Sequence, residues 1–339
     1  RAAMRIGIVY ELFGAYPRRA DDPPDAQVEY EPEATLLVLE AAIRRLGHQP
    51  VRLGRPHDLL AAGAKGAVAV DAALTIAEGF GSRNREAWAP VLLEMLGIPQ
   101  VGSDALTLSL SLDKAWTRAV VAEAGVRVAP GRVVASEAEA WQEDAMPGFP
   151  CFVKPRWEGS SKGIGLGSRA DDRAALAAAV ARVVGSYRQP ALVERFLAGP
   201  EYTVTLIDNA PPRALPVLQR ALEATTRIGL HAVEPKPGEA PADAAVGLVH
   251  CVPGTLDPAL ESELVEQAAR AFRALDCRDF ARADFKCDDD GRPCFLEINP
   301  LPTFAPEGSF GIHAELLGRP LDDLLAEVLG AGLRRLGAG

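Results

Sequence analysis

Two alternating apolar runs on either side of Asp290-Gly291 constrain the fold of this 339-residue chain more than any other feature. The runs cover residues 280–286 and 295–299. An Asp-Gly pair between two such runs predicts a β-hairpin with a two-residue turn. Because successive side chains of a strand point to opposite faces, one face of this hairpin is apolar and the other is polar.

The polar face of the predicted hairpin carries two opposed carboxylates. Counting outward from the turn places Asp284 opposite Glu297, and it places Arg282 opposite Asn299. Facing carboxylates repel each other unless a cation lies between them, and hard oxygen ligands suit Mg²⁺. An exposed polar hairpin face without any ligand is the alternative. Both interpretations remain open at this level.

A second feature is a loop rich in glycine and serine, residues 158–165, which we call the serine loop. It follows a short strand that ends near Lys154 and has Ser160 and Ser161 at its centre. Backbone N–H groups of such a loop can surround phosphate oxygens, with the lysine as a point charge. The loop matches neither the P-loop pattern nor the dinucleotide fingerprint. A phosphate lid and a flexible hairpin loop both remain open.

A third feature is an apolar strand with carboxylates along its edge, residues 192–197, which is followed by Gly199-Pro200-Glu201. Phe196 and Leu197 can receive a purine ring, and Glu201 can accept a hydrogen bond from a ribose hydroxyl. An ordinary strand and turn is the alternative.

In this order, the three features resemble the ATP-grasp superfamily and, within it, the D-alanine–D-alanine ligase group. The resemblance runs from about residue 78 to residue 308 and includes Leu112-Asp113-Lys114 and Gly199-Pro200-Glu201. It implies a three-domain ATP-grasp fold, α/β and α+β, with a parallel α/β N-terminal domain. The alternation of strand and helix patterns over the first hundred residues independently predicts that parallel layer.

The expected domains are an N-terminal substrate domain, a central ATP-grasp lid domain and a C-terminal ATP-grasp domain with the metal and substrate site. They cover residues 1–103, 104–190 and 191–339.

The resemblance also implies a role for individual residues. Those expected to bind ATP are Lys114, Lys154, Ser160, Ser161, Glu194, Phe196, Leu197, Glu201 and Lys236. Two Mg²⁺ ions, for which Mn²⁺ can substitute, are expected at Asp284, Glu297 and Asn299. The expected catalytic residues are Arg282, Ser160 and Lys236. In the implied reaction ATP converts a carboxylate to an acyl phosphate, which an amine attacks to give an amide, ADP and phosphate.

The region expected to bind substrate departs from the ligase pattern. The ligases carry Gly-Gly-x-Ser-x-Glu after the first strand, whereas this chain has a longer loop that leads to Glu29 and Glu31. Either glutamate can grip a substrate amino group or only cap the next helix. Arg83 and Arg85 replace an acidic turn, and they can meet a substrate carboxylate or lie in solvent.

Two later loops also depart from the ligase pattern. One keeps Lys236 but loses the tyrosine that locks onto the serine loop in the ligases. In the other, Thr303 replaces a glycine whose N–H helps to form an oxyanion hole. An extra residue beyond it either shifts the substrate-binding serine to Ser309 or removes its role. The chain therefore keeps the ATP-binding motifs of the ligases, whereas the loops expected to bind the substrates differ in sequence. This pattern favours a carboxylate–amine ligase whose substrates are not two D-alanines.

Charge and composition exclude other classes of protein. With 36 Lys and Arg against 46 Asp and Glu, the chain is a poor binder of nucleic acid or anionic membranes. It has no apolar run long enough to span a bilayer, and its five scattered cysteines lack metal-site spacing. We therefore expect a cytoplasmic enzyme acting on small-molecule carboxylate and amine substrates, and a homodimer by analogy with the ligases. The alternatives are D-alanine–D-alanine ligase itself, an ATP-dependent carboxylase and a non-catalytic nucleotide-binding module.

Overall fold

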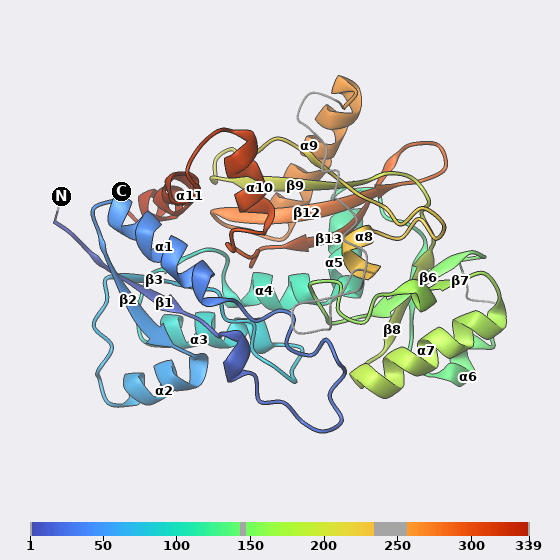
Figure 1. The fold of residues 1–339 in the computed structure, drawn as a ribbon, viewed down its shortest axis with the longest axis horizontal. Helices are drawn as coiled ribbons and strands as arrows, with labels where there is room; N and C mark the ends of the chain where they lie inside the picture. The colour runs from blue at the N-terminus through green and yellow to red at the C-terminus, as the bar shows by residue number, and fades with distance from the viewer. Residues whose placement is uncertain (1, 143–146, 234–255, 338–339) are drawn as a thin grey trace.

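The described part of the chain forms three β-sheets, which Figure 1 shows with the helices packed around them. The fold is given by a computed structural model that describes residues 2–142, 147–233 and 256–337. In the described part of the chain, no helix is both long and apolar enough to cross a membrane.

The first sheet is parallel, which confirms the α/β layer predicted from the sequence. Its strand order is β2-β1-β3-β4. The strands are β1 Arg5–Val9, β2 Gln49–Gly54, β3 Ala72–Thr75 and β4 Gln100–Val101, and the accompanying helices are η1 Phe13–Ala15, α1 Glu33–Arg45, α2 Pro56–Ala64, η2 Arg85–Ala87 and α3 Trp88–Met95. Helix α1 buries Leu36, Leu39 and Ile43, which share one face at helical spacing.

The central sheet is antiparallel, with the strand order β5-β8-β6-β7. Its elements are β5 Gly131–Val134, α6 Glu137–Ala140, β6 Cys151–Pro155, η3 Leu166–Ser168, β7 Arg169–Ala170, α7 Arg173–Tyr187 and β8 Ala191–Arg195. The alanine-rich helix α7 covers one face of this sheet through Leu176, Val180 and Val183. The other face is left for the site.

The third sheet is antiparallel and contains the predicted hairpin. Its strands are β9 Glu201–Ile207, β10 Arg213–Ala214, β11 Leu218–Arg220, β12 Phe280–Cys287 and β13 Pro293–Asn299, and the helices of this region are α8 Leu230–Val233, α9 Pro258–Ala274, α10 Ser309–Leu316 and α11 Leu321–Arg335. Helix α9 begins where the Asp257 carboxylate accepts the backbone N–H of Ala259 and Pro258 occupies the first turn.

At two places, an element that the expected limits assign to one domain packs with the sheet of another. Strand β8 follows residue 190, yet it pairs with β5 and β6 of the central sheet. Helices α4 Ala105–Leu112 and α5 Lys114–Glu123 follow residue 104, yet Val121 of α5 packs against Phe285 and Phe295 of the third sheet. A strand or helix pattern shows which face is buried, but it does not identify the partner that buries it.

The hairpin turn differs from the prediction, but the pairing at the polar end does not. The turn has three residues, 289–291, with Gly291 at φ +78°, so the two-residue turn was wrong. A bulge at Leu296 adds a second one-residue shift, which cancels the first. Asp284 therefore faces Glu297, and Arg282 faces Asn299, as the sequence predicts.

The end of the chain returns to the first sheet. Helix α11 lies beside α1, at the side of the molecule where both termini are found (Figure 1). The two helices share a core with Phe280, Phe304 and Phe310, whose neighbouring ring centroids are 5.2 Å apart. This core packs the N-terminal layer against the third sheet.

Candidate active site

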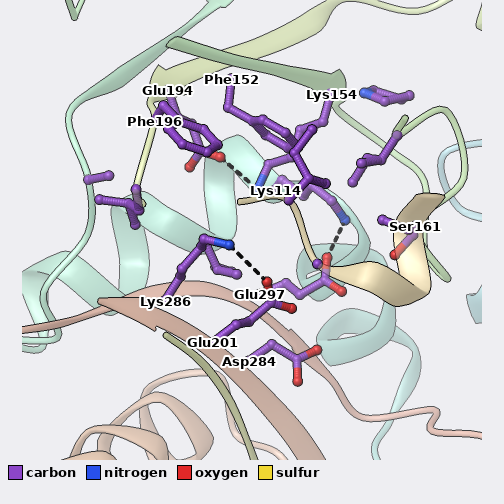
Figure 2. Close-up of a pocket in the computed structure, with 18 of the residues that line it drawn as sticks. Lys114, Phe152, Lys154, Ser161, Glu194, Phe196, Glu201, Asp284, Lys286 and Glu297 are labelled. Carbon is purple, nitrogen blue, oxygen red and sulfur yellow. Dashed lines mark hydrogen bonds and ion pairs between the residues drawn. The ribbon is translucent and has the colours of Figure 1, made fainter. Parts of the chain in front are cut away.

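Most of the residues predicted to bind ATP line a pocket between the central and third sheets (Figure 2), whereas Ser160 lines a neighbouring cavity instead. From the central sheet, Phe152 and Lys154 of β6 and Glu194 of β8 line this pocket. Asp284 and Glu297 face them from β12 and β13. The other predicted ATP residues that line it are Lys114, Ser161, Phe196, Leu197 and Glu201.

The pocket also contains residues that the sequence reasoning missed. Phe152 stands two positions before Lys154, and Lys286 two positions after Asp284, so strand alternation could have found both. The Lys286 ammonium lies 3.3 Å from the Glu201 carboxylate. Ile228, which adds apolar surface, comes from a turn that carries no local signal of such a role.

Buried ion pairs arrange the charged side chains of this pocket. Lys154 lies 2.6 Å from Glu194, and Arg118 of α5 is a second partner of the same carboxylate. Lys114 lies 2.7 Å from Glu297. Burial alone raises the pKa of Glu297, but Lys114 and Lys154 outweigh it and hold that pKa at about 2. Glu297 is therefore ionised, as a metal ligand must be.

The three residues predicted to bind metal lie on the facing strands of the hairpin. Asp284 accepts a hydrogen bond from the Thr203 hydroxyl at 2.7 Å, and its other oxygen lies 2.9 Å from Arg282. Arg282 also lies 4.0 Å from Glu297. Asn299 contributes an amide oxygen, which accepts the backbone N–H of Leu301 at 2.9 Å.

This donor set fits magnesium that is shared with a nucleotide. Two carboxylates and an amide oxygen are hard ligands, and Mg²⁺ usually completes its shell with water and substrate phosphates. The described residues contain no group of three or more His, Cys, Asp or Glu side chains that could hold a metal alone.

The serine loop is docked onto the N-terminal layer. Ser160 and Ser161 have φ values of +47° and +55°, and both adopt the left-handed conformation. At Gly163 a Cβ atom would lie only 2.4 Å from the ring of Pro155, so glycine is required there. The N–H of Gly163 donates to Asp25 at 2.9 Å. In this structure the loop therefore covers the site.

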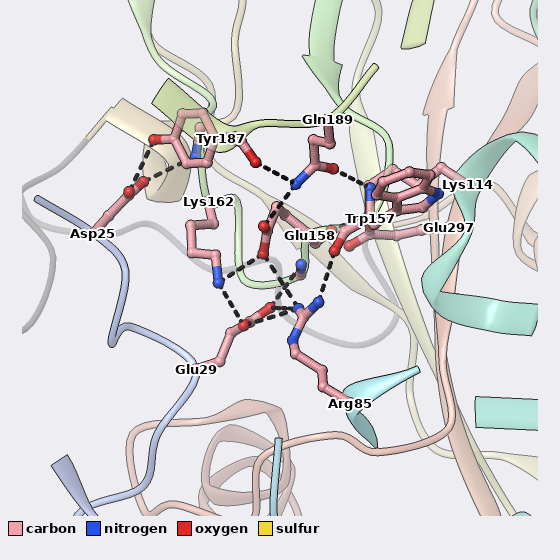
Figure 3. A network of polar contacts seen from close by, with 12 residues as sticks. Asp25, Glu29, Arg85, Lys114, Trp157, Glu158, Lys162, Tyr187, Gln189 and Glu297 are labelled. Carbon is pink, nitrogen blue, oxygen red and sulfur yellow. Dashed lines mark hydrogen bonds and ion pairs between the residues drawn. The ribbon is translucent and has the colours of Figure 1, made fainter. Parts of the chain in front are cut away.

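Glu29 and Arg85 form the centre of an ion-pair network that holds this loop (Figure 3). Arg85 lies 2.9 Å from Glu29 and 3.2 Å from Glu158, and its side chain is only 4% exposed. Glu29 also accepts the Gly159 N–H at 2.8 Å and binds the Lys162 ammonium at 2.7 Å. Burial raises the pKa of Glu29, but Arg85 and Lys162 hold it at about 2. The structure thus places Arg85 in a buried network, not in solvent.

The remaining predicted substrate residues have separate surroundings. Burial raises the pKa of Glu31, which accepts hydrogen bonds from the hydroxyls of Thr35 at 2.6 Å and Thr303 at 3.1 Å. The Arg83 guanidinium lies over Trp116, 4.5 Å from the ring centroid.

Ser309 is buried at the start of α10, and its hydroxyl has no hydrogen-bond partner among the described residues. Lys236 lies outside the described residues.

Replacing Lys162 by methionine is expected to loosen the serine loop. The variant loses the contacts of the ammonium with Glu29 at 2.7 Å and with Glu158 at 2.6 Å. Removing a buried ion-pair partner costs on the order of 1–3 kcal/mol, so the Gly159 amide should exchange with deuterium about tenfold faster or more. Lys65→Met, at an exposed lysine, is the control. Unchanged exchange at Gly159 would contradict the role given to Lys162.

Comparisons with known proteins place this fold and pocket in one class. The family model described as D-ala D-ala ligase C-terminus matches residues 120–330. The D-alanine–D-alanine ligase of Desulforudis audaxviator is 34% identical over 245 residues, which are 70% of this chain and 74% of that one. An uncharacterized protein of Sinorhizobium fredii is 31% identical over 260 residues, 77% of this chain and 74% of its own.

Among solved structures, the D-alanine–D-alanine ligase of Bacillus anthracis complexed with ATP shares the fold. Its TM-score is 0.71 at 20% identity, and the alignment covers 99% of this chain and 100% of that one. Fold and relatives define an ATP-grasp enzyme, an ATP-dependent ligase that forms C–N bonds. The chain belongs to the D-alanine–D-alanine ligase family.

Proposed function

We propose that the protein joins a small-molecule carboxylate to an amine, with ATP and two Mg²⁺ ions, and that its substrates are not two D-alanines. The observation that carries the ligase chemistry is the arrangement at the hairpin. Asp284, Glu297 and Arg282 lie together on one face of it and line or border a pocket whose opposite wall carries Lys154. Such a set neutralises the charge that phosphoryl transfer spreads over oxygen atoms.

Each residue group then has a defined task in the proposed reaction. Lys114 and Lys154 bind the phosphates, and the serine loop excludes water from the acyl phosphate. Bound Mg²⁺, held by Asp284, Glu297 and Asn299, would supply positive charge beside the transferred phosphoryl group. Arg282 stabilises the negative charge on that group and then on the tetrahedral intermediate.

The surroundings of Glu29 support a substrate other than D-alanine. In the ligases a glutamate after the first strand grips the amino group of the first D-alanine, and Glu29 and Glu31 are the two residues expected to replace it. Arg85 and Lys162 already neutralise Glu29, and Glu31 is hydrogen-bonded to Thr35 and Thr303. The second candidate is D-alanine–D-alanine ligase itself, which the 34% identity to the Desulforudis audaxviator enzyme favours. A homodimer remains a prediction.

The test is a substrate panel. ADP and phosphate release with Mg²⁺-ATP is measured against D- and L-amino acids and other carboxylates, singly and in pairs with amines, and products are read by mass spectrometry. We expect turnover with a pair other than two D-alanines. A D-alanyl-D-alanine product would establish the second candidate instead. Failure of every acid to release ADP would count against the ligase proposal.

A further inference from the structure

A second cavity adjoins the pocket between the central and third sheets, which we propose binds ATP, on the side of the N-terminal layer. Both cavities are lined by Lys114, Glu158 and Glu297, and the second one also reaches Ser160 and Asn299. It therefore lies where the serine loop meets the hairpin. An acyl phosphate formed at the ATP pocket would be open to attack from this side. The additional acidic side chains in its wall are Glu29, Glu78 and Glu86.

Two of these carboxyl groups come from the edge of the parallel sheet where ligands usually bind. Glu78 follows β3 by three residues, and Glu86 lies in the short helix η2 that comes after it. In open α/β sheets the crevice beyond the carboxyl ends of the strands is the usual binding position. Glu78 and Glu86 therefore lie at the edge of the sheet where a substrate is expected to bind.

The wall of the second cavity holds more acidic side chains than cations to pair with them. Glu29 and Glu158 are paired with Arg85 and Lys162, as Figure 3 shows. Within this network the two cations and the two carboxylates cancel in charge.

Lys114 is likewise occupied, because it lies 2.7 Å from Glu297. In the part of the chain that the structure describes, neither Glu78 nor Glu86 forms an ion pair, although Glu86 is only 6% exposed and lines the cavity. Their interaction with each other adds no positive charge. Arg85 and Lys114 act on Glu86 only through pairs that they already form with other carboxylates. A buried carboxylate with no ion-pair partner of its own is costly, so the cavity is suited to a positively charged ligand.

We propose that this cavity binds the ammonium group of the amine substrate, with the Glu86 carboxylate as its counter-charge and Glu78 hydrogen-bonded to that carboxylate, and that Glu86 accepts the proton released before attack. The inference rests on the proposed ligase function. It also names the substrate class: a cationic amine without a neighbouring carboxylate. A zwitterionic α-amino acid would find no uncommitted cation among the described residues of the cavity wall.

The proposed step is balanced in protons and electrons. The ammonium gives one proton to Glu86, and the free amine uses its lone pair to form the C–N bond with the acyl carbon. The C–O bond to phosphate breaks, and the leaving phosphate takes that electron pair and the second N–H proton. The products are an amide, hydrogen phosphate and a protonated Glu86, which then returns its proton to solvent.

The ionisation of Glu86 agrees with this role. Burial raises its pKa to about 7, and Glu29 also raises it, whereas Arg85, Lys114 and the hydrogen bond with Glu78 lower it. A base with a pKa near the working pH is the most effective proton acceptor. Because the carboxylate form is the active one, amide formation should rise with pH through about 7.

The first test measures binding without turnover. Calorimetric titration with propylammonium chloride is compared with titration with glycine, a zwitterion. Wild-type protein should bind propylammonium at least tenfold more tightly than glycine, and Glu86→Gln should weaken propylammonium binding at least tenfold. Glu94→Gln, at an exposed glutamate of α3, is the matched control and should bind as wild type does. Equal propylammonium binding by wild type and Glu86→Gln would overturn the proposal.

The second test separates attack by the amine from activation of the acid. Hydroxylamine is uncharged at neutral pH and traps an acyl phosphate as a hydroxamate without needing an ammonium site. For the acid and amine found in the panel, Glu86→Gln should keep hydroxamate formation within about twofold. Amide formation should fall about 10²-fold or more and lose its rise through pH 7. An equal loss of both products would show a structural role and overturn the proposal. Failure of the ligase function itself is read separately, as absence of ADP release in wild-type protein.

Discussion

Replacing Arg282 by alanine is expected to lower the turnover number by about 10³-fold and to leave the affinity for ATP nearly unchanged. The guanidinium lies beside the carboxylates of Asp284 at 2.9 Å and Glu297 at 4.0 Å, on the polar face of the hairpin. Phosphate binding is assigned to Lys114 and Lys154, so ATP loses little when Arg282 is absent. The transition state loses a positive charge that simple nucleotide binding does not need.

The measurement pairs single-turnover ADP release with ATP affinity from tryptophan fluorescence. Arg282→Lys should recover only part of the rate, because lysine keeps the charge but not the planar pair of donors that contacts Asp284. Arg292→Ala, at an exposed arginine near the hairpin turn, is the matched control and should turn over normally. An Arg282→Ala enzyme with wild-type turnover would show that the mechanism is wrong. Loss of ATP affinity in step with the rate would assign Arg282 to binding instead.

The polar end of the hairpin could be predicted from the sequence because strand alternation and antiparallel pairing are local rules. Asp284 opposite Glu297 follows from counting alone. The length of the turn could not be predicted in this way. Asp288, Asp289 and Asp290 are all suitable turn residues, so turns that begin at different positions fit the sequence equally well. The bulge at Leu296 has no local signature, and only its cancellation of the turn error preserved the pairing.

The network around Glu29 could not be predicted, because its members are far apart in the chain. Arg85 contacts Glu29 across 56 residues and Glu158 across 73, and no periodic pattern links such positions. An arginine in a loop more often lies in solvent, so sequence reasoning left its role open. The acidic side chains Glu78 and Glu86 carry no motif and become visible only when the sheet brings them to the serine loop.

Replacing Asp279 by alanine is expected to lower the free energy of unfolding by about 3 kcal/mol. Asp279 is fully buried directly before β12. Its carboxylate accepts the N–H of Gly102 at 2.7 Å and the side-chain amide of Asn209 at 2.8 Å, and it pairs with Arg335 of α11 at 2.7 Å. Gly102 follows β4 of the first sheet, Asn209 follows β9 of the third sheet, and Arg335 belongs to α11, so one side chain joins these three parts of the fold.

Urea denaturation followed by tryptophan fluorescence measures the loss. The residue has φ +65°, a conformation that asparagine and aspartate tolerate better than alanine does. Asp279→Asn keeps the shape and one acceptor oxygen without the charge, so it should lose less stability than Asp279→Ala. Asp289→Ala, at an exposed aspartate of the hairpin turn, should be nearly neutral. A loss below about 1 kcal/mol for Asp279→Ala would mean that water replaces its partners, and the junction would then depend on the apolar core around Phe304.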